Sequence, residues 1–261
     1  KTLRIIGVDG KDVTTIVGAK DETTLGAASM PGCGPAAMRC LYVGDGFGQI
    51  QGFTLQGGRT GDLSTSAEGQ RGGGVWMAGT GPFYVTDCTF SDCRGGPWGV
   101  VRAAFCQRCR FEDCHASTSM FNLTATLSCC EFDADCGCES GFKGISYNPT
   151  YHCSFAGAAG VWPYSEDDAN THVADVVGVG YQVTDKVTLY GGVFGDITVL
   201  QAPSGFVKAD PLFVDPATAD LRTLVSSPVF TAGEAMTAEN YGASYYKYMM
   251  TSDIDGNRIS F

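Results

Sequence analysis

Cysteine is the residue type with the most evident chemistry in this chain. The 261 residues include twelve cysteines, most of them in the segment from Cys40 to Cys153. Thiols at this density form disulfides in an oxidising compartment or hold a metal ion. Zinc needs a closed set of four ligands, and Cys106-x-x-Cys109 supplies one half of such a set, but the cysteines at 129, 130, 136 and 138 supply no second CxxC. The spacing favours disulfides, and we expect no metal.

Carboxylates and arginines lie among the same cysteines. A glycoside hydrolase needs a close pair of carboxylates, and a polysaccharide lyase needs acidic Ca²⁺ ligands beside a base. The available groups form no distinctive catalytic motif, so we assign no catalytic residue and interpret them as a solvated face. They are Asp87, Asp92, Asp113, Glu131, Asp133 and Asp135, with Arg102, Arg108 and Arg110.

A repeat positions these residues. VTDCTFSDC (85–93), CQRCRFEDC (106–114), SCCEFDADC (128–136) and the weaker YHCSFAGAA (151–159) align on Cys-x-Phe, with the aromatic residues Phe90, Phe111, Phe132 and Phe155 at steps of 21, 21 and 23 residues. Such a period is typical of stacked units that contact only their neighbours. In a strand, residues two apart face the same way, so we expect Cys and Phe to line the interior while Asp87, Thr89 and Ser91 face outward.

Parallel stacking at this step makes further predictions. It pairs Asp87 with Arg108 and Arg110 with Glu131 on adjacent strands. It also brings cysteines of adjacent units to α-carbon separations that a disulfide tolerates. In one alternative, disulfides join adjacent units, and each disulfide closes a loop of about 21 residues and stabilises the fold by on the order of 3 kcal/mol. In the other, free cysteine serves as a small apolar residue. We favour stapling for Cys93 with Cys114 and a small loop closed by Cys33 and Cys40, and leave both alternatives open for Cys88, Cys109, Cys130 and Cys153.

The rest of the chain extends this all-β pattern. LRIIGVDGKDVTTIVG predicts two strands, GQIQGFTLQGG places Phe53 and Leu55 at the Cys and Phe positions, and DKVTLYGGVF (185–194) predicts another strand. Loops at 19–37, 57–73 and 163–172 are expected to project. A leucine-rich repeat has a similar period, but no leucine recurs at a fixed step here. We expect one domain, 1–261, with 209–261 as the C-terminal rung and tail.

Composition restricts the location and the partners. The net charge of −11 and the pI near 4.6 argue against nucleic acid or anionic membrane as partners. The chain shows no apolar leader and no membrane span, and its cysteines indicate an extracellular or cell-surface location. Acidic stretches at 166–172 and 253–257 have the residue types that Ca²⁺ binds, but solvated turns are the favoured interpretation, so no cofactor is expected.

Several segments resemble a known family. LRIIGVDGKDVTTIVG, RCLYVGDGFGQIQGFTLQGG, GGGVWMAG, ADPLFVDPATADLRTLVSSPVFTAG and DIDGNRIS are similar to runs in right-handed parallel β-helix proteins of bacterial surfaces, including autotransporter and polymorphic outer-membrane-protein passengers, within the pectate-lyase-like superfamily. The resemblance spans nearly the whole chain and implies a right-handed parallel β-helix with rungs of about 21–25 residues. The usual asparagine of the rung motif is aspartate or cysteine here.

Fold does not determine function in such proteins. The favoured hypothesis is a non-enzymatic structural or adhesive protein that assembles with itself, head to tail, into a fibre. The alternatives are a polysaccharide lyase or glycoside hydrolase, and a module that binds surface glycans by stacking on Trp76, Trp98 or Trp162. Asn122-Leu-Thr124 is a glycosylation sequon.

Overall fold

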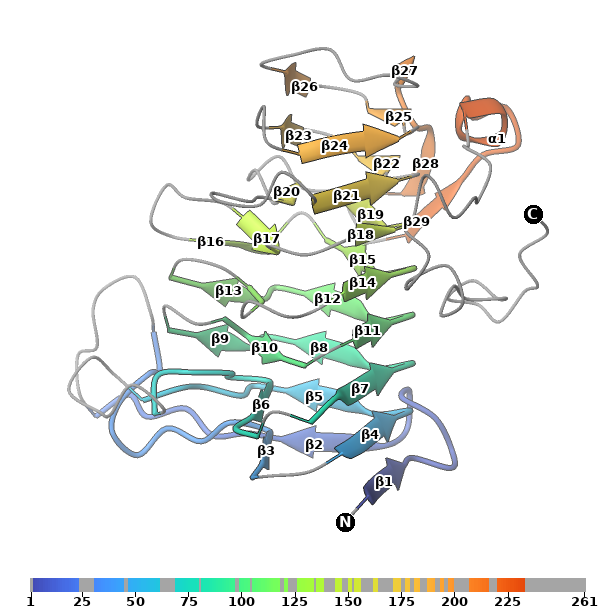
Figure 1. Ribbon diagram of the computed structural model, residues 1–261. Coiled ribbons are helices and arrows are strands. Elements are labelled where there is room, and N and C mark those ends of the chain that lie inside the picture. Colours follow the sequence, from blue (N-terminus) through green and yellow to red (C-terminus); the bar gives the residue numbers. More distant parts are fainter. Residues whose placement is uncertain are drawn as a thin grey trace.

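The computed structural model is built from short strands stacked in parallel (Figure 1). It describes residues 2–23, 31–44, 47–61, 69–79, 81–96, 99–103, 105–117, 120–121, 126–133, 135–138, 144–146, 150–151, 153–155, 162–163, 171–174, 177–178, 181–183, 187–190, 193–194, 197–199, 207–215 and 220–232. Over most of 144–208 only the backbone is described. The fold is all-β apart from one helical turn, and its stacked parallel strands are compatible with a parallel β-helix.

Two long parallel sheets run the length of the stack. Sheet 1 contains, in spatial order, β1 (Thr2–Ile6), β4 (Phe47–Gln51), β7 (Phe83–Thr86), β11 (Phe105–Gln107), β14 (Thr126–Ser128), β18 (Thr150–Tyr151), β21 (Thr171–Ala174) and β24 (Val187–Tyr190). Sheet 2 contains β2 (Thr15–Val17), β5 (Thr54–Gln56), β8 (Thr89–Ser91), β12 (Arg110–Glu112), β15 (Glu131–Phe132), β19 (Ser154–Phe155), β22 (Val177–Gly178), β25 (Val193–Phe194) and β27 (Val207–Lys208). We call one strand of each sheet, joined along the chain, a rung.

Smaller parallel sheets complete the rungs. They are β3 (Leu41–Val43) with β6 (Val75–Met77) and β10 (Val101–Arg102); β9 (Arg94–Gly95) with β13 (His115–Ala116) and β16 (Gly137–Cys138); β17 (Gly144–Ser146) with β20 (Trp162–Pro163); and β23 (Tyr181–Val183) with β26 (Ile197–Val199). The predicted strands near the N-terminus and at 185–194 are confirmed as β1, β2, β24 and β25. The described parts of the loops at 19–37 and 57–73 extend sideways from the lower end of the stack (Figure 1), whereas most of 163–172 lies outside the described residues.

The C-terminal segment lies beside the stack. Beyond β27 the chain forms an antiparallel pair, β28 (Phe213–Asp215) and β29 (Asp220–Thr223), and a single helical turn, α1 (Val229–Ala232). The pKa of Asp220 is about 2, because Arg222 donates a hydrogen bond to it and, more weakly, because the charge of Arg110 on β12 is close. Residues 233–261 lie outside the described residues.

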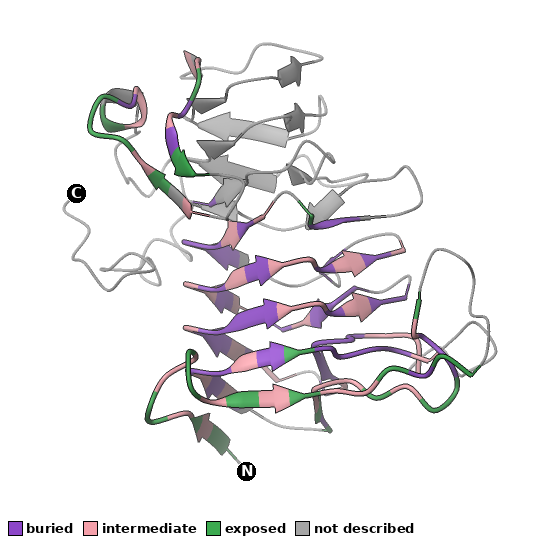
Figure 2. Ribbon diagram, turned by 180° about the vertical axis from the view of Figure 1, so that it is seen from behind, coloured by how far each residue is buried: buried purple, intermediate pink, exposed green. Residues whose placement is uncertain are grey.

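The core consists of inward columns of identical or similar side chains. Phe111 pairs in register with Phe90 on one side and Phe132 on the other, with ring centroids 4.8 and 4.7 Å apart and planes within 6° of parallel. All three rings are fully buried, and Leu55 continues the column below Phe90. The predicted register is therefore confirmed at its centre. Figure 2 shows that buried residues occupy the middle rungs and exposed residues the first one.

The repeat bends where the sequence pattern predicted a straight strand. Asp87 and Cys88 form a corner between β7 and β8, and Asp92 and Cys93 a second corner between β8 and β9. The expected inward positions of cysteine and phenylalanine are correct, but Thr89 does not face solvent. It lies in register between Thr54 and Arg110 and is buried, with 9% of its surface exposed.

Truncation of the central ring tests this packing. We expect Phe111→Ala to lower the free energy of unfolding by about 3–5 kcal/mol, the range for emptying a buried phenylalanine site. The matched control is Phe105→Ala, since Phe105 is a half-buried outward ring stacked on Tyr84 at 5.0 Å and should cost only about 1 kcal/mol. Urea unfolding of the two variants measures both values, and equal losses would contradict the assignment of Phe111 to the core.

Candidate functional site

The charged residues of the repeat gather at the two corners of each rung. The first corner begins with Gly52, Asp87, Arg108 and Cys129 in successive rungs, and the second with Gly57, Asp92 and Asp113; all have φ between 47° and 77°. This left-handed conformation suits glycine and is tolerated by aspartate, but it is unfavourable for other side chains. Neighbouring groups must therefore hold the corners of Arg108 and Cys129 in place.

At the second corner a buried arginine forms hydrogen bonds to an aspartate of the next rung. Arg59 is 2% exposed, and its guanidinium donates to both the backbone carbonyl oxygen and the Oδ1 atom of Asp92, the latter at 2.5 Å. It also donates to the carbonyl oxygen of Pro31 at 3.3 Å. Lys20 lies 2.8 Å from the other carboxylate oxygen of Asp92. This cluster therefore ties the 19–37 loop to the stack.

The same arrangement recurs one rung further on. The backbones of Arg94 and Arg59 form a parallel β-bridge. Arg94 donates to the carbonyl oxygen of Asp113 and to its Oδ1 at 2.9 Å. His115 Nε2 lies 3.1 Å from the same Oδ1 atom. The carboxylate of Asp133 accepts hydrogen bonds from the backbone N–H groups of Asp113 and Cys136. Each acid thus secures a turn of the backbone.

At the first corner the predicted ion pairs are present. Arg108 donates to both carboxylate oxygens of Asp87, the second at 2.7 Å, and Gln51 donates to Asp87 from the rung below at 2.9 Å. Arg110 Nε donates to Glu131 at 3.0 Å. Both pairs link adjacent rungs, as the 21-residue register predicted.

These contacts determine what the carboxylates can do. A general acid for glycoside cleavage needs a raised pKa, and a nucleophile needs a free carboxylate face. Burial opposes ionisation of Asp92, but hydrogen bonds and charge from Lys20 and Arg59 outweigh it and lower the pKa of this carboxyl. Asp87, Asp92, Asp113, Glu131 and Asp133 all accept from arginine or backbone donors. Their arrangement holds corners together.

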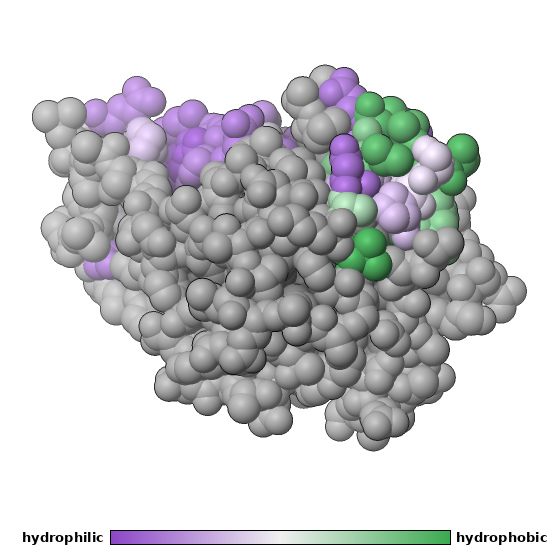
Figure 3. All heavy atoms as spheres, turned by 90° about the horizontal axis from the view of Figure 1, so that it is seen from above, coloured by the Kyte–Doolittle hydropathy of each residue, from purple (hydrophilic) through white to green (hydrophobic). Residues whose placement is uncertain are grey.

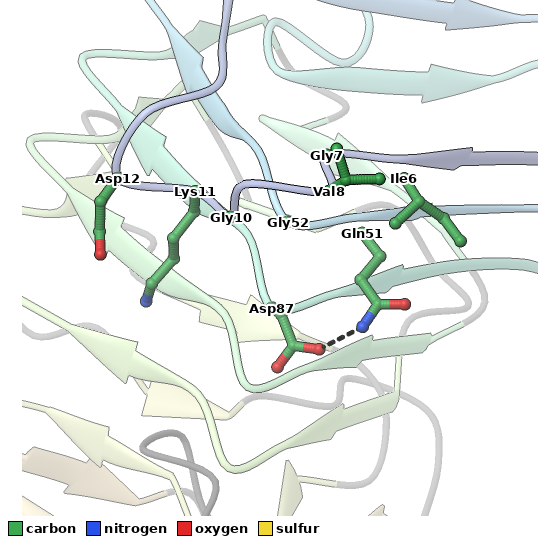
Figure 4. A pocket seen from close by; sticks show the side chains of 9 residues that line it. All are labelled: Ile6, Gly7, Val8, Gly10, Lys11, Asp12, Gln51, Gly52 and Asp87. Carbon is green, nitrogen blue, oxygen red and sulfur yellow. Dashed lines mark hydrogen bonds between the residues drawn. The ribbon is translucent and has the colours of Figure 1, made fainter.

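A shallow cleft of about 380 Å³ lies at the first corner of the lowest rungs (Figure 4). It is lined by Ile6, Gly7, Val8, Gly10, Lys11, Asp12, Gln51, Gly52 and Asp87. Figure 4 shows Gln51 turned toward Asp87, to which it donates. Of the two acids that line the cleft, Asp87 is therefore already bonded within the stack.

The aromatic residues differ from the glycan-stacking prediction. Trp76 is fully buried between the guanidinium groups of Arg71 and Arg102, 5.2 and 4.6 Å from its ring, so this prediction is wrong for Trp76. Trp98, the side chain of Trp162 and Asn122 lie outside the described residues. Tyr84 was among the aromatic residues that the sequence offered for stacking on sugars, but sequence reasoning missed Phe105, on which Tyr84 stacks, although the 21-residue step between them matches the repeat.

The eleven cysteines with described side chains all carry free thiols, so disulfide formation stays a prediction. Cys88, Cys109, Cys130 and Cys153 lie inside the stack, as do Cys93 and Cys114. Cys33 contacts Thr60 whereas Cys40 contacts Cys93, so the structure gives these two thiols different neighbours. Within the described residues, no three His, Cys, Asp or Glu side chains are grouped as a metal site.

Comparison with known proteins adds no relative. No family model, curated protein or solved structure matches the chain. Among the described residues, no helix has the length and apolar character that crossing a membrane requires. Function must therefore be argued from the geometry of the chain itself.

The two aspartate corners make a matched pair for mutation. Asp92→Asn keeps the shape and the left-handed corner but leaves the buried Arg59 guanidinium without a counter-charge, so we expect a loss of about 3 kcal/mol in unfolding free energy. Asp113→Asn is the control, because its side chain is 48% exposed and should lose at most about 1 kcal/mol. Chemical unfolding at pH 7 measures both.

The stability of these variants should also depend on pH. Because the folded pKa of Asp92 is lowered, its contribution is complete above the ordinary aspartate value of about 3.9 and is lost as the pH falls through the folded pKa. The advantage of the wild type over Asp92→Asn should therefore shrink below about pH 4. A difference that stays constant from pH 7 to pH 3 would exclude this ion pair as its source.

Proposed function

We propose that this protein is a right-handed parallel β-helix with a non-enzymatic structural and adhesive role outside the cell or on its surface. The observation that carries the proposal is that five of the six candidate carboxylates, Asp87, Asp92, Asp113, Glu131 and Asp133, bind arginines or backbone N–H groups of the stack. Parallel strands joined by a crossover favour the right-handed form. The density of cysteines supports the extracellular location.

The outer face of sheet 1 supports adhesion to glycans. Tyr84 and Phe105 stack with their planes 5° from parallel and remain partly exposed. Gln49 lies beside Tyr84 in register, and Gln107 lies two residues after Phe105, on the same face of the strand. Flat aromatic surface flanked by amides is suited to contact with sugar rings.

A polysaccharide panel tests both parts of this proposal. Binding and reducing-end release are measured side by side for the wild type, for Tyr84→Ala/Phe105→Ala and for Asp87→Asn. We expect no cleavage by any of the three proteins, and at least a tenfold weaker binding only in the aromatic double variant. Cleavage that is lost in Asp87→Asn would support a hydrolase or lyase instead, and binding unaffected by loss of both rings would remove the adhesive face.

The distribution of exposed apolar residues supports assembly with a second copy through two unlike surfaces, the first rung and the C-terminal segment beside the stack. Described large apolar side chains that are exposed cluster at the first rung, namely Leu3, Ile6, Val8, Val13 and Val17, and in the C-terminal segment, namely Val214, Leu224, Val225 and Phe230. Figure 3 shows the second cluster over α1 and β28. Between them only Met38 and Tyr42 are of this kind.

Among the described residues, no further strand pairs with the outer edges of the first rung, and its inward side chains are less buried than those of the next rung. β1 and β2 stand at the edges of the two long sheets, and the inward Ile5 and Ile16 are only partly buried, whereas Ile50 and Leu55 above them are fully buried. An edge of parallel strands is a template for another strand. Contact between unlike ends builds an open filament when the rotation does not close.

Charged substitutions at the two clusters test this assembly. Val17 and Val225 are 67% and 95% exposed, and we expect Val17→Lys and Val225→Lys to abolish concentration-dependent filaments, as followed by electron microscopy and sedimentation. Asp135→Lys is the control, since Asp135 is exposed in the turn before β16 and belongs to neither cluster. A wild-type chain that stays monomeric at every concentration would overturn the proposal, and loss of filaments in Asp135→Lys would show a non-specific effect of charge.

A further inference from the structure

Eight of the cysteines form two columns that run along the stack. One column follows the first corner and contains Cys88, Cys109, Cys130 and Cys153. The other follows the second corner and contains Cys40, Cys93, Cys114 and Cys136. All are buried except Cys40, which is partly exposed. Each column is thus a row of four sulfur atoms within the hydrophobic interior.

The thiols within each column point the same way. Four of them donate to a carbonyl oxygen of the preceding rung: Cys109 to Val85 at 3.5 Å, Cys130 to Cys106 at 3.4 Å, Cys114 to Phe90 at 3.4 Å and Cys136 to Phe111 at 3.3 Å. Neighbouring thiols are within hydrogen-bond reach of one another, from Cys40 to Cys93, Cys93 to Cys114 and Cys114 to Cys136, and from Cys109 to Cys130 and Cys130 to Cys153. Sulfur therefore faces sulfur from rung to rung.

Cys40 enters its column from another part of the rung. Gly58 occupies the position equivalent to Cys93, since Arg94 N–H donates to the Gly58 carbonyl as His115 N–H donates to that of Cys93. A Cβ atom on Gly58 would lie 2.7 Å from Cys40 Sγ. The thiol of Cys40 thus fills the space that a cysteine side chain at position 58 would occupy. Because of this substitution the column has an even number of sulfur atoms.

The number of atoms in each column determines how they can pair. In a row of four where only neighbours touch, the one arrangement that pairs every member joins the first with the second and the third with the fourth. Neighbours in parallel register are about 4.8 Å apart, within the α-carbon range of disulfides. Cys40 is not in register with Cys93, but its thiol is within hydrogen-bond reach of the Cys93 thiol. We propose that oxidation staples the stack through four disulfides, Cys40–Cys93, Cys114–Cys136, Cys88–Cys109 and Cys130–Cys153.

Cys33 and Cys106 lie outside both columns. Cys106 lies between Val85 and Leu127 in sheet 1. Cys33 contacts Thr60. We expect both to remain thiols. The pairing of Cys93 with Cys114, which the sequence alone favoured, would leave Cys40 and Cys136 without partners at the two ends of the column.

The oxidant in this proposal is a small-molecule disulfide such as oxidised glutathione. A protein thiolate attacks one of its sulfur atoms, which forms a mixed disulfide and releases one glutathione thiolate. The partner cysteine then attacks the protein-side sulfur as its thiolate, which closes the staple and releases the second glutathione. Each staple thus removes two protons and two electrons from the protein and reduces one glutathione disulfide to two thiols.

The exchange must run before the stack closes. Burial raises the pKa of the Cys109, Cys114 and Cys130 thiols, and a thiol without thiolate character does not react. Oxidation should therefore accompany folding, and the folded reduced chain should resist it. This inference concerns the chain itself and does not depend on the proposed function.

Oxidative refolding tests the pairing. The reduced, unfolded full chain is refolded with reduced and oxidised glutathione, the remaining thiols are blocked by alkylation, and the crosslinked peptides are identified by mass spectrometry without reduction. We expect the four named crosslinks, and alkylation of Cys33 and Cys106. Crosslinks of Cys93 to Cys114 or of Cys109 to Cys130 as the main products would overturn the proposal, as would a refolded chain with all thiols alkylated.

Two variants keep the test decisive. Cys40→Ala should redirect its column to a single crosslink at Cys93–Cys114 or Cys114–Cys136 and leave the other column unchanged, whereas Cys153→Ala should free Cys130 or Cys88 and leave the Cys40 column unchanged. Cys33→Ala is the control outside both columns and should preserve all four crosslinks. A change in both columns from either single substitution would contradict independent columns, and loss of the crosslinks in Cys33→Ala would assign Cys33 to the network.

Discussion

In-register stacking of rungs is the constraint on which the rest of this structure depends. Phe111 can lie flat between Phe90 and Phe132 only because each rung returns the chain to the same position one strand spacing further on. A residue inserted into one rung would move every following side chain out of its column and expose the apolar set. The stack therefore tolerates extra length only in loops outside the sheets, such as those between β2 and β3 and between β5 and β6.

The corners turn the chain so that each rung lies above the one before. Ion pairs at the corners offset the unfavourable left-handed backbone conformation. A left-handed residue such as Asp92 is less favourable than an extended one, but its carboxylate and its carbonyl oxygen are both held by Arg59. The arginine comes from the rung before, so the bond that secures one corner also joins two rungs. Arg94 and Asp113 repeat the device. Because each pair spans rungs, the loss of one should be felt on both sides of it, as in other proteins in which repeats contact only their neighbours.

Much of this was predictable because the repeat is local and regular. The 21-residue step is sufficient to derive the phenylalanine column and the pairs of Asp87 with Arg108 and Arg110 with Glu131. The corner at Asp87 was not predictable from the sequence. A left-handed residue between extended ones leaves the alternation of apolar residues along the chain unchanged. The burial of Trp76 and Arg59 and the substitution of Cys40 for a side chain at Gly58 depend on contacts between distant segments, which a periodic pattern does not contain.

The packing of the stack also restricts which residues can serve a function. Inward columns are filled by apolar side chains and thiols, and the described corner acids Asp87, Asp92 and Asp113 are bonded within the stack. What remains are the outward columns, where side chains recur at one rung spacing, and the two ends. The outward column through Tyr84 and Phe105 places two aromatic rings on adjacent rungs, with Gln49 in register on one side and Thr126 on the other. In the proposed adhesive role, a partner of this face is an extended molecule that lies along the stack and contacts adjacent rungs.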